Sequence, residues 1–112
     1  MPPVDASTAP TTPASAGVVV IGRNEGSRLL AVLRELQRQP RPLLYVDSGS
    51  SDGSADNVQA LGIAVLRLDP SRPFSAARAR NEGAQALLQQ HPALAYLQFL
   101  DGDCFMAPGW LD

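Results

Sequence analysis

The chain has 112 residues, enough for one domain at most, and its formal net charge is −2, with nine arginines, no lysine and eleven acidic residues. This balance leaves no basic patch for nucleic acid, and the single cysteine cannot form an internal disulfide. No stretch reaches the roughly 18 consecutive apolar residues of a transmembrane segment, so we expect a soluble, cytoplasmic protein.

Residues 1–16 differ in composition from the rest of the chain. They are almost entirely proline, threonine, serine and alanine, so they have little to bury. They also lack the basic and apolar regions of a secretory signal. We therefore predict a disordered leader over residues 1–16 and a folded part over residues 17–112.

Short apolar runs alternate with helical patterns along the folded part. Strands are predicted over residues 17–22, 43–46, 63–68 and 95–100. The first predicted helix buries Leu29, Val32, Leu33 and Leu36 and ends before Pro40, the second covers residues 54–61, and the third covers about 75–90. In the third helix Ala77, Ala84, Leu87 and Leu88 are available for packing. The alternation predicts an α/β domain with a Rossmann-like parallel sheet and flanking helices.

Polar residues follow three of the four predicted strands. They are Arg23, Asn24 and Glu25 after the first strand, Asp47, Ser48 and Asp52 after the second, and Asp101 and Asp103 after the fourth. Parallel sheets bind ligands outside the carboxyl ends of their strands. Loops are polar in any protein, which would explain one such cluster, but three clusters at one edge predict a shared site.

The order and spacing of these clusters resemble the family-2 glycosyltransferases along the whole of residues 17–112. The matching segments are Ile21-Gly-Arg-Asn-Glu25, Val46-Asp-Ser-Gly-Ser-Ser-Asp-Gly-Ser54, Ala79-Arg-Asn-Glu-Gly83, Phe99-Leu-Asp-Gly-Asp103 and Pro108-Gly-Trp-Leu111. Each motif is weak alone, but five in order are specific. The resemblance implies the GT-A fold and transfer of a sugar from a nucleotide-diphosphate sugar to a polysaccharide, lipid or protein acceptor.

Two departures from the family pattern fall in the region that would hold the nucleotide. Gly22 and Arg23 replace a Pro/Thr-Tyr pair, and Ser48 replaces the second aspartate of a pair that helps relatives to recognise the base. A hydroxyl can still hydrogen-bond a base edge, although it carries no charge. The choice between uridine and guanosine therefore stays open.

The resemblance also implies a divalent cation, Mn²⁺ or Mg²⁺, at the Asp-x-Asp segment. Residues two apart in an extended strand point the same way, so Asp101 and Asp103 can address one ion. We expect Asp103 to bind the metal directly and Asp101 to bind ribose or metal. Gly102 would let the backbone approach the ligand, and the cation would neutralise charge on the departing diphosphate.

The predicted donor-binding residues are Gly22, Arg23, Asn24, Glu25, Asp47, Ser48, Arg80, Asn81 and Asp101. Structural alternatives stay open for several of them. Asp47 could brace its turn, and Asn24 or Glu25 could cap the following helix. Of Arg78 and Arg80, one is expected to be a solvated surface charge, and the family match favours Arg80 for binding.

In the family the catalytic base lies well downstream of Asp-x-Asp, and this chain ends at Asp112. We therefore expect a fragment or truncated product that carries the donor-binding half and is inactive alone. One alternative is a non-catalytic nucleotide-binding remnant. A remote alternative is a phosphatase of the haloacid dehalogenase type, whose Asp-x-Asp motif opens a domain, whereas here the motif closes one.

Overall fold

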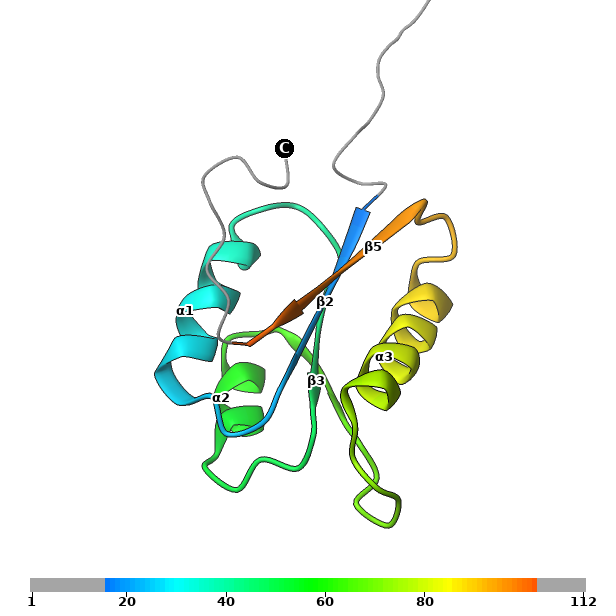
Figure 1. Cartoon of the computed structure of the whole chain (residues 1–112). Coiled ribbons are helices and arrows are strands. Elements are labelled where there is room, and N and C mark those ends of the chain that lie inside the picture. The colour runs from blue at the N-terminus through cyan, green and yellow to red at the C-terminus, as the bar shows by residue number, and fades with distance from the viewer. Residues whose placement is uncertain (1–15, 103–112) are drawn as a thin grey trace, which may run out of the picture.

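The computed structural model describes residues 16–102, along which strands and helices alternate (Figure 1). The elements are β2 (Ala16–Gly22), α1 (Gly26–Gln37), β3 (Leu43–Asp47), α2 (Ser54–Ala60), β4 (Ala64–Arg67), α3 (Ala76–Gln90) and β5 (Tyr96–Asp101). Every element predicted within these residues is confirmed. Strand β2 begins inside the predicted leader, because Ala16 pairs with Tyr96 of β5. The rest of the leader and Asp103 lie outside the described residues.

The four described strands form one parallel sheet in the order β4-β3-β2-β5. Strand β2 lies between β3 and β5, and its apolar run is buried from Gly17 to Ile21, as is typical of a strand covered on both faces. In the pairing register Gly22 lies opposite Asp47, and Ile21 lies opposite Asp101. The ends of β2, β3 and β5 therefore meet at one edge of the sheet.

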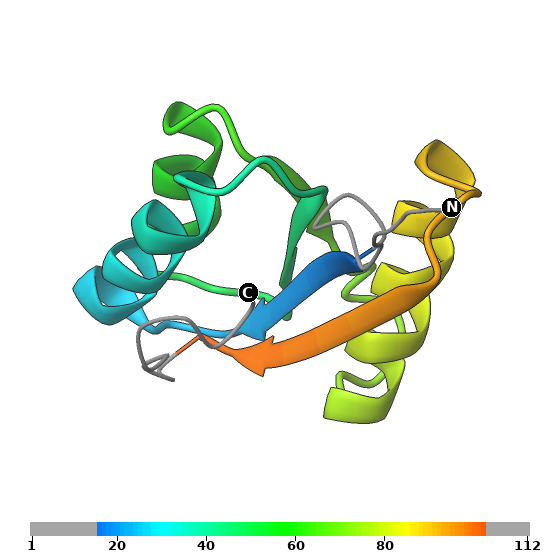
Figure 2. The same ribbon diagram turned by 90° about the horizontal axis from the view of Figure 1, so that it is seen from above.

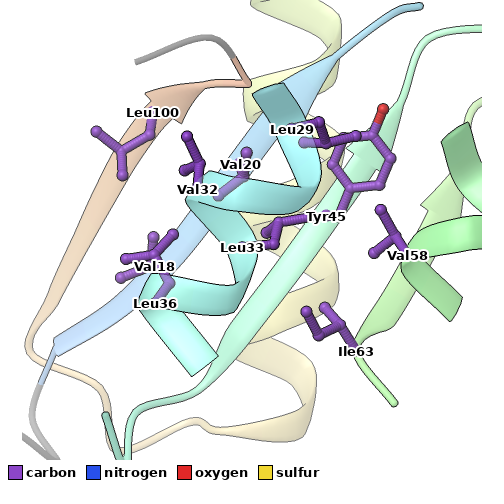
Figure 3. Packing of buried hydrophobic residues seen from close by; sticks show 10 residues of the cluster. All are labelled: Val18, Val20, Leu29, Val32, Leu33, Leu36, Tyr45, Val58, Ile63 and Leu100. Carbon is purple, nitrogen blue, oxygen red and sulfur yellow. The ribbon is translucent and has the colours of Figure 1, made fainter. Parts of the chain in front are cut away.

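Helices cover both faces of the sheet, with α1 and α2 on one face and α3 on the other (Figure 2). Because side chains alternate along a strand, Val18 and Val20 of β2 face α1, whereas Val19 and Ile21 face α3. Figure 3 shows the first of these two layers, in which Leu29 and Leu33 of α1 pack against β2 and β3. The two apolar layers fix the strand ends on which the candidate site is built.

The buried face of α3 differs from the prediction. Ala77 is exposed and Leu88 is 39% exposed, whereas Leu87 is buried as predicted and Ala84 is partly buried. The residues that reach the sheet are Ala79, Gly83 and Leu87. They are spaced four apart and form one helical stripe. The prediction missed Gly83 because a residue without a side chain gives no hydrophobic signal.

Candidate functional site

A cleft of about 360 Å³ opens at the carboxyl edge of the sheet. Its lining residues are Ile21, Gly22, Arg23, Glu25, Ser48, Phe74, Ser75, Ala76 and Asp101. The chain runs from β2 outward through β3 and β4, and then returns to place β5 on the other side of β2. The strand order reverses between β2 and β5, and open α/β sheets bind ligands at this switch point. The cleft also falls in the volume range of small-molecule sites.

The structure brings part of the predicted donor-binding set together in this cleft. Gly22, Arg23 and Glu25 follow β2, Ser48 follows β3, and Asp101 ends β5. These residues come from three segments that are far apart in sequence. The cleft thus matches the geometry expected from the strand ends, while the role of each residue stays a prediction.

Arg80 and Asn81 lie elsewhere. They line a separate groove of about 950 Å³ along α3, together with Gln85 and with Phe99 of β5. The predicted set therefore divides between the cleft and this groove. Arg80 is exposed, and donor binding by Arg80 and Asn81 stays a prediction.

Asp47 is buried beneath the turn that follows β3, with only 4% of its surface exposed. Its carboxylate accepts hydrogen bonds from the Tyr45 hydroxyl at 2.7 Å, from the Ser50 backbone N–H at 2.8 Å and from the Ser50 hydroxyl at 2.6 Å. Burial, and then the bond to Asp47, raise the pKa of Tyr45 far above its usual range, so the phenol keeps its proton and donates. These hydrogen bonds are the ones expected if Asp47 braces its turn, and donor binding by Asp47 stays a prediction.

Asn24 ties the loop after β2 to the loop after β3. Its backbone N–H donates to the Ser50 hydroxyl at 2.9 Å, and its Oδ1 accepts from the Ser51 N–H at 2.8 Å. The Asn24 backbone is left-handed, with φ of 54°, a conformation that asparagine tolerates better than most residues. Glu25 precedes α1 without a side-chain capping bond. Asn24 therefore clamps two loops and does not cap α1.

Asp52 shapes the start of α2. Its carboxylate accepts from both the backbone N–H and the hydroxyl of Ser54, and the hydroxyl bond, followed by the backbone bond, lowers the pKa of Asp52. The neighbouring Gly53 has φ of 82°, which glycine adopts without strain. The Asp-Gly-Ser segment is thus turn chemistry that positions the loop beside the cleft.

Asp101 can serve as one ligand of a divalent cation. It is exposed at the end of β5, and within residues 16–102 its carboxylate makes no hydrogen bond or ion pair. Among the same residues no group of three acidic, histidine or cysteine side chains gathers at one point. Mg²⁺ often uses one or two carboxylates together with substrate phosphates, so a carboxylate at this position fits such a cation. The predicted direct ligand, Asp103, lies outside the described residues.

At Gly102 the backbone comes close to other atoms of the protein. A Cβ there would lie 3.1 Å from side-chain carbons of Glu25 and Leu29, and the Gly102 N–H donates to the Ile21 carbonyl at 2.8 Å. The glycine therefore lets the chain turn tightly beside the cleft directly after Asp101.

Four cleft residues were absent from the predicted donor-binding set: Ile21, Phe74, Ser75 and Ala76. Ser75 caps α3, because its hydroxyl accepts from the Arg78 N–H at 3.0 Å. A serine before a helical pattern signals such a cap, and the helix start predicted near residue 75 is confirmed. Phe74 gives no such signal, since an isolated aromatic residue in a loop predicts no partner.

Arg78 braces the loop before α3. Its Nε donates to Glu82 at 2.6 Å, and its Nη1 donates to the carbonyls of Arg72 at 3.0 Å and Pro73 at 3.2 Å. The bond from Arg78 lowers the pKa of Glu82. Of the two arginines considered from the sequence, Arg78 is thus the structural one and Arg80 the exposed one.

The fold is that of an α/β protein with a cleft at the switch point of its parallel sheet. The model of the family "Glycosyl transferase family 2" matches residues 17–112, and the chain belongs to that family. Membership supports glycosyl transfer and implies a nucleotide-sugar donor. A search of curated proteins found no match. Within residues 16–102 there is no helix with the length and apolar character needed to span a bilayer.

Proposed function

We propose that this chain forms the donor-binding part of a glycosyltransferase and that its cleft binds a nucleotide-diphosphate sugar. The observation that carries the proposal is the meeting of Arg23, Ser48 and Asp101 in one cleft at the switch point. In the complete reaction the sugar would pass to a polysaccharide, lipid or protein acceptor.

The cleft offers a separate chemical group for each part of such a donor. The Arg23 guanidinium and the amino terminus of α3, at Ser75 and Ala76, favour the negative diphosphate. The Ser48 hydroxyl can donate to or accept from a base edge or ribose.

Asp101, with Asp103 beyond the described residues, would hold Mn²⁺ or Mg²⁺. A bound cation supplies charge neutralisation on the leaving diphosphate. The residues of this chain bind and orient the donor, and the acceptor hydroxyl additionally needs a general base.

Thermal unfolding of the chain with UDP and with GDP, each with and without Mn²⁺, tests the proposal. A ligand present at 100 times its Kd stabilises the folded state by about 2.7 kcal/mol, so we expect a shift of several degrees with one nucleotide. Asp101→Asn should lose the Mn²⁺-dependent part of the shift. The matched control is Glu35→Gln, which removes an exposed carboxylate near the carboxyl end of α1, outside the cleft, and should keep the shift.

A folded chain that responds to neither nucleotide would refute the proposal, as would an Asp101→Asn variant with an unchanged Mn²⁺ effect. Binding alone does not separate a transferase from a nucleotide-binding remnant. Release of free nucleotide with transfer of the sugar to water or to an added acceptor, measured by chromatography, would show transferase chemistry.

A further inference from the structure

Phe74 lies where three segments of the chain meet. The guanidinium carbon of Arg23, from the loop after β2, is 5.7 Å from the centroid of its ring, and that of Arg78, from α3, is 5.8 Å away. The ring also lies against the turn after β3, because a Cβ on Gly49 would approach its Cε2 to 2.7 Å. The Phe74 side chain therefore contacts the loop after β2, the turn after β3 and the helix α3.

The two arginines on this ring differ in their other partners. Arg78 is 11% exposed, pairs with Glu82 at 2.6 Å and donates to two carbonyls, so its charge is compensated. Arg23 is exposed, lines the cleft and makes no ion pair or hydrogen bond within residues 16–102. The ring face attracts both cations. Nη2 of Arg78 has no hydrogen-bond partner within residues 16–102 but is buried, whereas the Arg23 side chain is exposed on the cleft and can reach a ligand.

The backbone next to Arg23 is held in place by hydrogen bonds of Asn24. Asn24 is clamped to Ser50 and Ser51 by the two hydrogen bonds at 2.9 and 2.8 Å. Because the backbone is held, the orientation of the long Arg23 side chain depends on the group that its guanidinium contacts. That group is the Phe74 ring. Ordering such a side chain before binding lowers the entropic cost of binding.

We propose that Phe74 is a positioning residue that holds the Arg23 guanidinium in the cleft for the diphosphate of the donor. The inference rests on the proposed function and adds to it a residue and a ligand group. Arginine binds phosphate oxygens through paired N–H donors. The acidic Glu25 and Asp101 on the same cleft suit a divalent cation, which leaves Arg23 as the side chain for the phosphate oxygens.

Isothermal titration with UDP and GDP in the presence of Mn²⁺, and with the corresponding nucleosides, tests this role by a double-mutant cycle. We expect Arg23→Gln to weaken diphosphate binding about ten- to hundredfold. Phe74→Leu should weaken it about two- to fivefold, and should have no further effect in the Arg23→Gln background. Phe74→Tyr keeps the ring and should restore wild-type affinity, and nucleoside binding should change in none of the variants.

The control Tyr96→Leu removes an exposed ring at the amino end of β5, opposite Ala16 and outside both the cleft and the groove along α3, and should leave the affinity unchanged. Thermal melting of each variant checks that it is folded, and Phe74→Met provides the same test if Phe74→Leu does not fold. Equal losses from Phe74→Leu with and without Arg23, or an equal loss from Tyr96→Leu, would overturn the inference while leaving the donor site intact. A wild-type chain that binds neither nucleotide would overturn the proposed function and this inference together.

Discussion

Gly83 lies in the middle of α3, where the helix rests directly on the sheet. A Cβ at this position would lie 2.7 Å from Cγ2 of Val46 and 2.8 Å from Cγ1 of Val19. Both valines are fully buried, and their β-branched side chains have little rotamer freedom. Gly83→Ala therefore forces α3 away from β2 and β3, although the same change favours the helix itself.

The magnitude follows from these opposing effects. Overpacking a core costs about 1–3 kcal/mol, and two contacts below 3.0 Å with stiff partners place this site in the upper part of that range. Alanine is favoured over glycine inside a helix by about 1 kcal/mol. We expect a net loss of about 1–2 kcal/mol, which for a domain of this size lowers Tm by roughly 5–15 °C.

Urea denaturation followed by far-UV circular dichroism measures this change. The matched control places Gly83→Ala in a Val46→Ala background, where one clashing methyl pair is gone and the helix preference remains. There the substitution should cost less than in the unchanged chain, because only the contact with Val19 at 2.8 Å remains. If Gly83→Ala stabilises the otherwise unchanged chain, the close approach of α3 to the sheet is wrong.

Two further predictions concern the loops around the cleft. The pKa of Glu82 is lowered by Arg78, so the unfolded chain binds the proton more readily than the folded chain. This stabilisation of the folded state is complete above the usual glutamate pKa and is lost as the pH falls through the lowered pKa. Between pH 6 and pH 3 the Tm should therefore fall less in Glu82→Gln than in the wild type. An equal fall of Tm in both proteins would contradict this. Asn24→Ala removes the acceptor of the Ser51 N–H and places alanine at φ of 54°. It should destabilise the clamp by about 1–3 kcal/mol, seen as faster hydrogen exchange at Ser51, whereas an unchanged exchange rate would show that the clamp does not protect this amide.

The element order could be predicted from the sequence because each element carries its own periodic signal. The apolar run of β2 and the stripe of α1 at Leu29, Leu33 and Leu36 are such signals, and the structure confirms both. The packing face of α3 could not be predicted as well. Alanine is common on both faces of this helix, so Ala77 and Ala79 look alike in sequence, and only the fit of Gly83 against the sheet decides between them.

The candidate site was predictable where residues directly follow a strand. Gly22, Ser48 and Asp101 reach one cleft because parallel strands end at the same edge. Arg80 lies further along α3, and its position depends on the helical phase, which a local motif does not define. Phe74 stands in an irregular loop, where packing against Gly49 is a tertiary property that no periodicity reports.

Asp47 shows why a residue type at a strand end does not define its role. A carboxylate has about four lone-pair sites, and three hydrogen bonds from Tyr45 and Ser50 already use most of them. With 4% of its surface exposed, Asp47 could bind a nucleobase only if Ser50 moved, which would also release the bond from Asn24. Ser48 lines the cleft and needs no such exchange. In this chain a contact with the nucleoside therefore costs less free energy at Ser48 than at the aspartate beside it.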